Sequence, residues 1–69
     1  MSAQFIHVEV ILPSQERASQ SLNINYIVAF NDSQGFFTEV IMTRGAYIVD
    51  MPYEEFVSLM NHANIINRI

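Results

Sequence analysis

Residues 40–56 read VIMTRGAYIVDMPYEEF, and the spacing of the apolar residues changes within this stretch. Up to Val49 the apolar side chains follow one another as in strands, and Arg44-Gly45 indicates a tight turn. Gly45 would supply the positive φ that a two-residue hairpin requires. From Pro52 onward the apolar residues return at helical spacing. The stretch therefore predicts strands over about 36–43 and 46–49 and a helix over about 52–63.

The start of this helix is marked by several residue types that favour a helix N-terminus. Asp50 is a candidate N-cap, and Pro52 suits the first turn because its missing N–H is not needed there. Glu54 and Glu55 follow, where the positive end of the helix dipole stabilises acids. Asparagine recurs later, and we expect the helix to end within residues 61–64.

The first half of the chain contains two further apolar segments separated by polar ones. The first segment alternates apolar and polar residues and ends at Pro13, which cannot donate to a central ladder. The polar stretch that follows is expected to be an exposed loop. The turn-forming residues 31–35 predict a hairpin loop. These segments predict strands over about 4–12 and 22–30 and a loop over 13–21.

Together the segments predict an α+β fold in one domain over residues 1–69. Four strands joined by short loops form an antiparallel meander, and the C-terminal helix packs on one sheet face. The inner face is the one whose residues are uniformly apolar, and we expect it to contain Ile6, Val8, Val10, Val40, Met42, Tyr47 and Val49. The helix residues expected to cover it are Phe56, Leu59, Met60 and Ala63.

The opposite sheet face is the unusual feature of the sequence. An open antiparallel sheet normally shows polar residues to water, yet this face mixes His7, Glu9 and Glu39 with five large apolar side chains. Either the sheet curls and buries both faces within one chain, helped by the apolar tail 65–69, or this face is a protein–protein interface. The simplest partner would be another copy. The predicted interface residues are Phe5, Ile11, Phe37, Ile41 and Ile48.

Composition excludes several classes of protein and leaves an interaction domain. Half of the 69 residues (51%) are hydrophobic and only 14% are charged, which excludes disorder. The chain has no cysteine, so it has neither disulfides nor a thiol nucleophile. Its net charge is −4 with three scattered arginines, which argues against nucleic acid. No basic leader and no membrane-spanning run is present, so we expect a cytoplasmic protein that does not insert into membranes.

The sequence gives only weak signals for a metal site or a catalytic site. His7, Glu9 and His62 would have to converge from opposite ends of the chain to bind a metal. The sequence contains no nucleophile elbow and no phosphate-binding loop. The ring-forming RNA-binding barrels have similar length, but they need a basic rim that three arginines do not supply. We therefore expect no catalytic residues, no metal and no cofactor.

Three segments resemble a known family: residues 22–30 (LNINYIVAF), the hairpin 40–49 (VIMTRGAYIV) and the helix start 52–56 (PYEEF). They are similar to a family of very small bacterial flagellar and swarming-motility accessory proteins. The resemblance covers roughly residues 5–60. It implies a strand, an asparagine-marked segment leading to a second strand, a glycine hairpin and a helix that opens with paired glutamates. It also implies a protein that is not an enzyme.

The sequence thus favours a small, non-enzymatic regulatory module that binds proteins and forms homo-oligomers, and the resemblance implies an accessory role in motility. An alternative belongs to a different class, a small inhibitor of the kind encoded by phages and mobile elements. Such a protein would block a host protein through an acidic face made of Glu9, Glu39, Asp50, Glu54 and Glu55.

Overall fold

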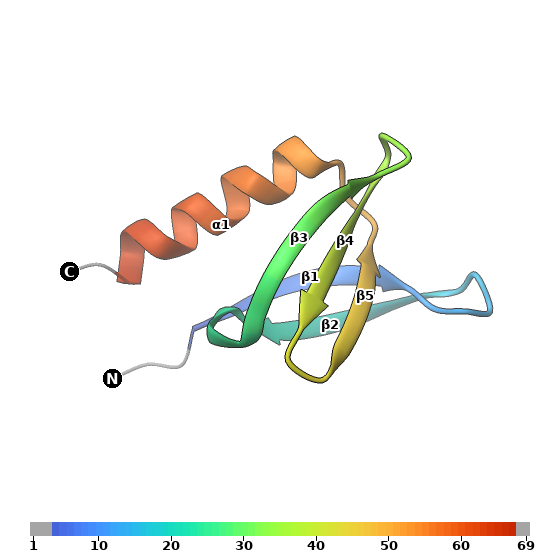
Figure 1. Cartoon of the computed structure of the whole chain (residues 1–69), viewed down its shortest axis with the longest axis horizontal. Coiled ribbons are helices and arrows are strands. Elements are labelled where there is room, and N and C mark those ends of the chain that lie inside the picture. Colours follow the sequence, from blue (N-terminus) through green and yellow to red (C-terminus); the bar gives the residue numbers. More distant parts are fainter. Residues whose placement is uncertain (1–3, 68–69) are drawn as a thin grey trace.

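The computed structural model of the chain describes residues 4–67, with side chains to residue 63. It confirms the α+β class: one antiparallel sheet is accompanied by one C-terminal helix (Figure 1). The elements in chain order are β1 (Phe5–Ile11), β2 (Arg17–Asn23), the 3₁₀ turn η1 (Ile24–Tyr26), β3 (Ile27–Ser33), β4 (Phe37–Met42), β5 (Gly45–Val49) and α1 (Tyr53–Asn67).

The sheet has five strands in the order β2-β1-β5-β4-β3, so the expectation of four strands was wrong. It consists of a β1–β2 hairpin and a β3–β4–β5 meander, which Figure 1 shows crossing each other. The two parts are joined where β1 pairs with β5, at Val10–Val49 and Ile11–Ile48. We call these two residue pairs the β1–β5 seam.

The extra strand is β2, which lies where the sequence predicted a loop over 13–21. The loop is confined to a turn in which the Leu12 N–H donates to the Glu16 carbonyl (2.7 Å) and the Gln15 N–H donates to the Leu12 carbonyl (2.8 Å). Pro13 fits the position after Leu12 because its φ suits that part of a turn. The polar residues from Arg17 onward then pair with β1 along its whole length. They form a strand despite their polarity because β2 is the edge of the sheet and meets water on its open side.

The expected strand over 22–30 is divided in two by η1. The Asn23 side chain accepts a hydrogen bond from the Asn25 N–H (2.9 Å), which holds the chain in the turn between β2 and β3. β3 then continues to Ser33, so part of the expected loop 31–35 is strand. The remaining turn is residues 34–36, in which the Phe36 N–H donates to the Ser33 carbonyl (3.3 Å). Its central residues Gln34 and Gly35 have φ of 60° and 81°, and a type I′ turn needs positive φ at both positions.

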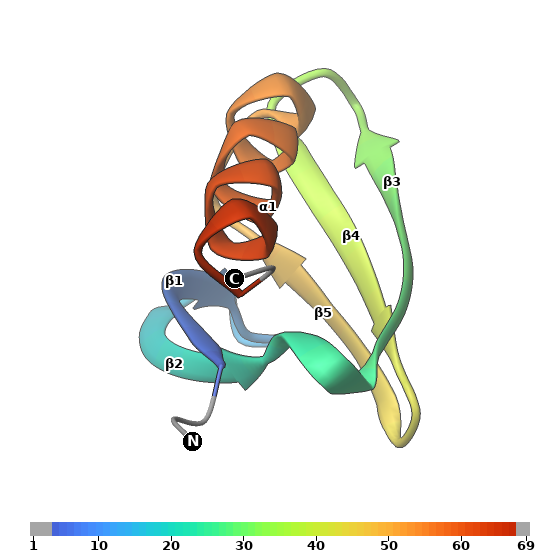
Figure 2. The same ribbon diagram turned by 90° about the vertical axis from the view of Figure 1, so that its left-hand side faces the viewer.

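The inner face of the sheet was predicted correctly. Phe56 of α1 is fully buried on it, and its ring meets the Phe30 ring edge-on at a centroid distance of 4.9 Å. Figure 2 shows α1 lying in the angle between the two parts of the sheet. The buried apolar core is Ile6, Val8, Val10, Leu22, Ile24, Val40, Val49 and Phe56. Partly buried around it are the other expected residues Met42, Tyr47, Leu59, Met60 and Ala63.

The link between β5 and α1 is held by a buried hydroxyl. Thr38 is fully buried, and its side chain donates to the Met51 carbonyl (2.9 Å). Asp50, the expected N-cap, instead accepts a hydrogen bond from Arg17.

The helix runs to Asn67, so the expected end within 61–64 was wrong. Asparagine lowers helix propensity only modestly and does not by itself end a helix. The predicted contribution of the tail side chains 65–69 lies outside the described side chains.

The buried Phe56 ring allows a direct test of the core. Phe56→Ala should lower the free energy of unfolding by about 3–5 kcal/mol, because it leaves a cavity between sheet and helix. Phe36 is 69% exposed, and Phe36→Ala should change the free energy of unfolding by less than about 0.5 kcal/mol. Urea denaturation of both variants measures the difference, and equal midpoints would contradict this placement of the helix.

The β1–β2 turn allows a second test, because Gln15 has a φ of 75°. At this φ a residue with a Cβ atom is disfavoured, because the Cβ comes too close to the backbone, whereas glycine is not. Gln15→Gly should therefore raise the free energy of unfolding by up to about 1 kcal/mol. Gln20 lies in the extended strand β2, and the matched change Gln20→Gly should lower it by about 0.5–1 kcal/mol. Thermal unfolding of both variants tests the turn, and a loss of stability in Gln15→Gly would refute it.

Candidate functional site

The five predicted interface residues lie on the outer face of the sheet, away from α1. Pairing across the strands shows this, because residues directly opposite each other in an antiparallel sheet share a face. Ile11 is opposite Ile48, and Ile48 is opposite Glu39 on its other side. The neighbours of these residues along each strand, such as Val10, Val40 and Val49, face the core. The alternation along each strand places Phe5, Phe37 and Ile41 on the same outer side.

Four of the five residues share one region of the outer face. Ile11, Phe37, Ile41 and Ile48 lie on the adjacent strands β1, β4 and β5, and each is half-buried within the chain. We call these four residues the outer patch. The exposed Phe36 ring extends it, with its centroid 6.3 Å from that of Phe37.

Glu39 lies inside the outer patch rather than at its border. It is half-buried, directly opposite Ile48 on β5 and Asn31 on β3. Phe37 and Ile41 lie two residues before and after it on β4. The surface is therefore apolar with one carboxylate near its centre.

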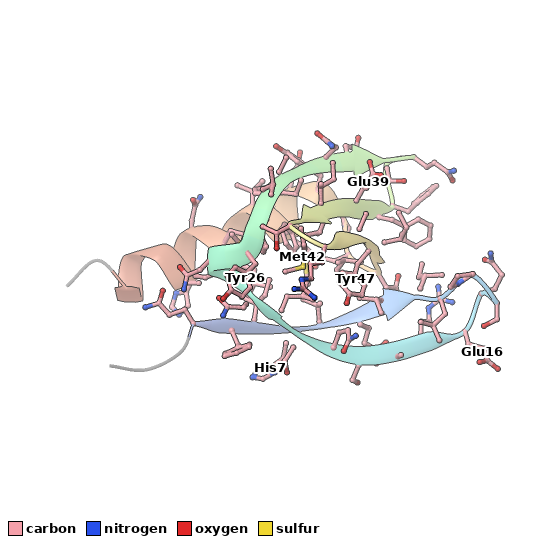
Figure 3. All side chains as sticks on the ribbon, turned by 60° about the horizontal axis from the view of Figure 1, so that its bottom comes forward. His7, Glu16, Tyr26, Glu39, Met42 and Tyr47 are labelled. Carbon is pink, nitrogen blue, oxygen red and sulfur yellow. The ribbon has the colours of Figure 1, made fainter. Side chains whose placement is uncertain are left out.

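Phe5 is the predicted residue that does not join the outer patch. It begins β1, pairs with Asn23 and is 46% exposed. Six residue-to-residue steps along the extended chain separate it from Ile11, a distance of about 20 Å. His7 and Glu9 occupy the outer positions between them. Figure 3 shows that His7 and Glu39 point away from opposite sides of the molecule, because the sheet wraps around its core.

The β1–β2 half of the outer face is polar and contains two side-chain contacts. His7 Nδ1 lies 2.7 Å from the Ser21 hydroxyl. Arg17 Nε donates to Asp50 Oδ2 at 2.9 Å, and this hydrogen bond together with the carboxylate charge raises the pKa of Arg17. The contact ties the start of β2 to the residue that follows β5.

The acids of the alternative inhibitor hypothesis are divided between the two layers of the fold. Glu9 and Glu39 are on the outer sheet face, whereas Glu54 and Glu55 are exposed on α1. Asp50 is paired with Arg17. Within the described residues, no three histidine, aspartate or glutamate side chains are grouped as metal ligands.

The sequence did not predict a hollow between η1 and the β4–β5 turn. It has a volume of about 310 Å³, and its walls include Tyr26, Met42, Arg44 and Tyr47. The Thr43 N–H donates to the Tyr26 carbonyl (3.1 Å), which brings the two turns together. Figure 3 shows Tyr26, Met42 and Tyr47 gathered between the two parts of the sheet. The available signal was a tyrosine in each of the two segments, but only the fold shows that both line the same hollow.

Comparison of the chain with protein-family models, with curated proteins and with solved structures finds no match. Among the helical residues that the structure describes, none forms a helix with the length and apolar character needed to cross a bilayer.

Proposed function

We propose that this protein is a non-enzymatic interaction module that binds another protein through the outer patch. One observation carries the proposal. Ile11, Phe37, Ile41 and Ile48 are half-buried apolar side chains that share one face of three adjacent strands, around Glu39. Faces of this kind normally carry polar residues in contact with water. Removing apolar surface from water is favourable, so a partner that covers the outer patch forms a more stable complex.

The position of Glu39 indicates which partner fits. Binding that covers the outer patch also removes water from this carboxylate, which is costly unless a cation meets it. A two-fold axis through the patch centre would bring the Glu39 side chains of two copies together and make them repel. The partner that fits is therefore a different protein, with aliphatic side chains surrounding a lysine or arginine. The pairing would add specificity more than affinity.

Binding rather than catalysis is favoured by the neighbours of Glu39. Ile48 and Asn31 are directly opposite it on either side. Neither side chain takes up or releases a proton near neutral pH. Glu39 thus has no acid or base directly opposite it on either neighbouring strand with which to form an acid–base pair.

Further parts of the proposal rest on the sequence. The resemblance to motility accessory proteins favours a regulatory role in which binding alone changes the assembly or activity of the partner. The absence of cysteine favours action in a reducing compartment such as the cytoplasm. The inhibitor alternative gains no support, because its five acids are spread over both layers of the fold.

The proposal is tested by affinity capture from a lysate of the native host, followed by quantitative mass spectrometry. Ile41→Glu places a second acid in the outer patch. Phe5→Glu is the matched control, because Phe5 is 46% exposed on the same sheet face but lies at the far end of β1, apart from the outer patch. We expect a protein captured by the wild type and by Phe5→Glu but lost with Ile41→Glu.

The captured partner is then purified and titrated by calorimetry. Ile41→Glu should weaken binding about tenfold or more, because it removes an apolar contact and places a second carboxylate where the partner excludes water. Glu39→Arg should weaken binding too, and reversing the charge of the partner's facing residue should restore it. Equal capture and equal affinity for all these variants would refute the proposal.

A further inference from the structure

β2 is an edge strand with one side open. It is last in the strand order, and its only neighbour among the described strands is β1. Arg17, Ser19, Gln20 and Ser21 are all exposed. Figure 3 shows β2 along the lower margin of the molecule.

Hydrogen bonds at both ends of the β1–β2 hairpin establish which backbone groups of β2 are free. The Leu12 N–H donates to the Glu16 carbonyl (2.7 Å), and the Ile24 N–H donates to the Gln4 carbonyl (2.9 Å). Hydrogen-bonded pairs alternate with non-bonded pairs in an antiparallel ladder. The even-numbered residues of β2 therefore bond to β1. The odd-numbered residues, including Ser19 and Ser21, direct their N–H and C=O groups away from it.

This edge lacks the features by which proteins normally prevent strand addition, which are bulges, proline, inward charges and lysine. The register with β1 is unbroken over all seven residues. The one charge on β2 belongs to Arg17, which is already paired with Asp50. The other edge strand differs. β3 has a bulge between Ile27 and Ala29 and carries Asp32.

We propose that β2 pairs antiparallel with β2 of a second copy, across a two-fold axis at Gln20. In this register Ser19 lies opposite Ser21 of the second copy, and their outward N–H and C=O groups bond to each other. Ala18 lies opposite Leu22 of the second copy on the inner face, so apolar residues meet there. The two five-stranded sheets become one continuous sheet.

The charges of the strand are compatible with this register. Arg17 lies opposite Asn23 of the second copy, so no like charges face each other along the ladder. A strand pairing with its own copy is closed by the two-fold axis, and no open edge of β2 remains for further addition.

The pairing rests on the β2 edge and not on the outer patch, so it stands apart from the proposed partner binding. Its consequence for that function is bivalence, because a continuous sheet would carry two outer patches. When the partner itself carries repeated binding sites, two linked outer patches bind it more tightly than either one does alone.

The first experiment measures mass by sedimentation equilibrium at high micromolar concentration. The wild type should have twice the 7.9 kDa chain mass. Ser19→Pro removes an outward N–H without breaking the β1–β2 ladder, and should give a folded monomer. The control Ser19→Ala keeps the N–H and should remain a dimer. Circular dichroism verifies that each variant is folded.

A second experiment tests the register and does not depend on proline. Ser19→Lys with Ser21→Lys places like charges opposite each other between copies, and should give a monomer. Ser19→Lys with Ser21→Glu places opposite charges there, and should restore the dimer at low salt.

Three outcomes would overturn the proposal. One is a wild type that is monomeric at high micromolar concentration. Another is that the two charge variants have the same mass. The third is a dimer that dissociates with Ile41→Glu but not with the doubly lysine-substituted strand, since that would assign self-association to the outer patch. A dimer that is unaffected by Ile41→Glu would mean that self-association does not use the outer patch, so partner capture tests the proposed function separately.

Discussion

The β1–β5 seam is the constraint on which the rest of the structure depends. Two residue pairs, Val10–Val49 and Ile11–Ile48, are the only strand pairing between the hairpin and the meander in the described chain. Both valines are fully buried or nearly so on the inner side, where the core continues across the junction. The two isoleucines are opposite each other on the outer side, so the seam also sets Ile11 beside the part of the outer patch that belongs to the meander. Core and candidate site therefore depend on the same register.

The sequence predicted the parts of the fold that local pattern determines. Alternation in β1 and β4 indicates which side chains face inward, and the change of period after Val49 indicates the helix. β2 was missed because an edge strand needs apolar residues only where its inner face is covered. In β2 those are Ala18 and Leu22, and five polar residues surround them. Such a pattern is typical of a loop until its partner strand is known.

The candidate site was predictable to a similar extent. Alternation alone places all five predicted residues on the outer face. Which of them meet depends on the order of the strands, and that order follows from pairing between distant segments. Phe5 shares the face but lies at the far end of β1. The hollow beside Tyr26 and Arg44 joins two turns that are far apart in sequence, and no period in the sequence connects them.

The seam also bears on how the chain folds. The hairpin and the meander are each made of neighbouring segments joined by turns of a few residues, and such hairpins form within about 1–10 μs. Val10 and Val49 can meet only after all the chain between them has closed into a loop, which carries an entropic cost that nothing local repays. We expect the folding barrier to lie at this single long-range encounter. The rate of folding would then be governed by how often two preformed pieces collide in register, and hardly at all by the speed of either piece.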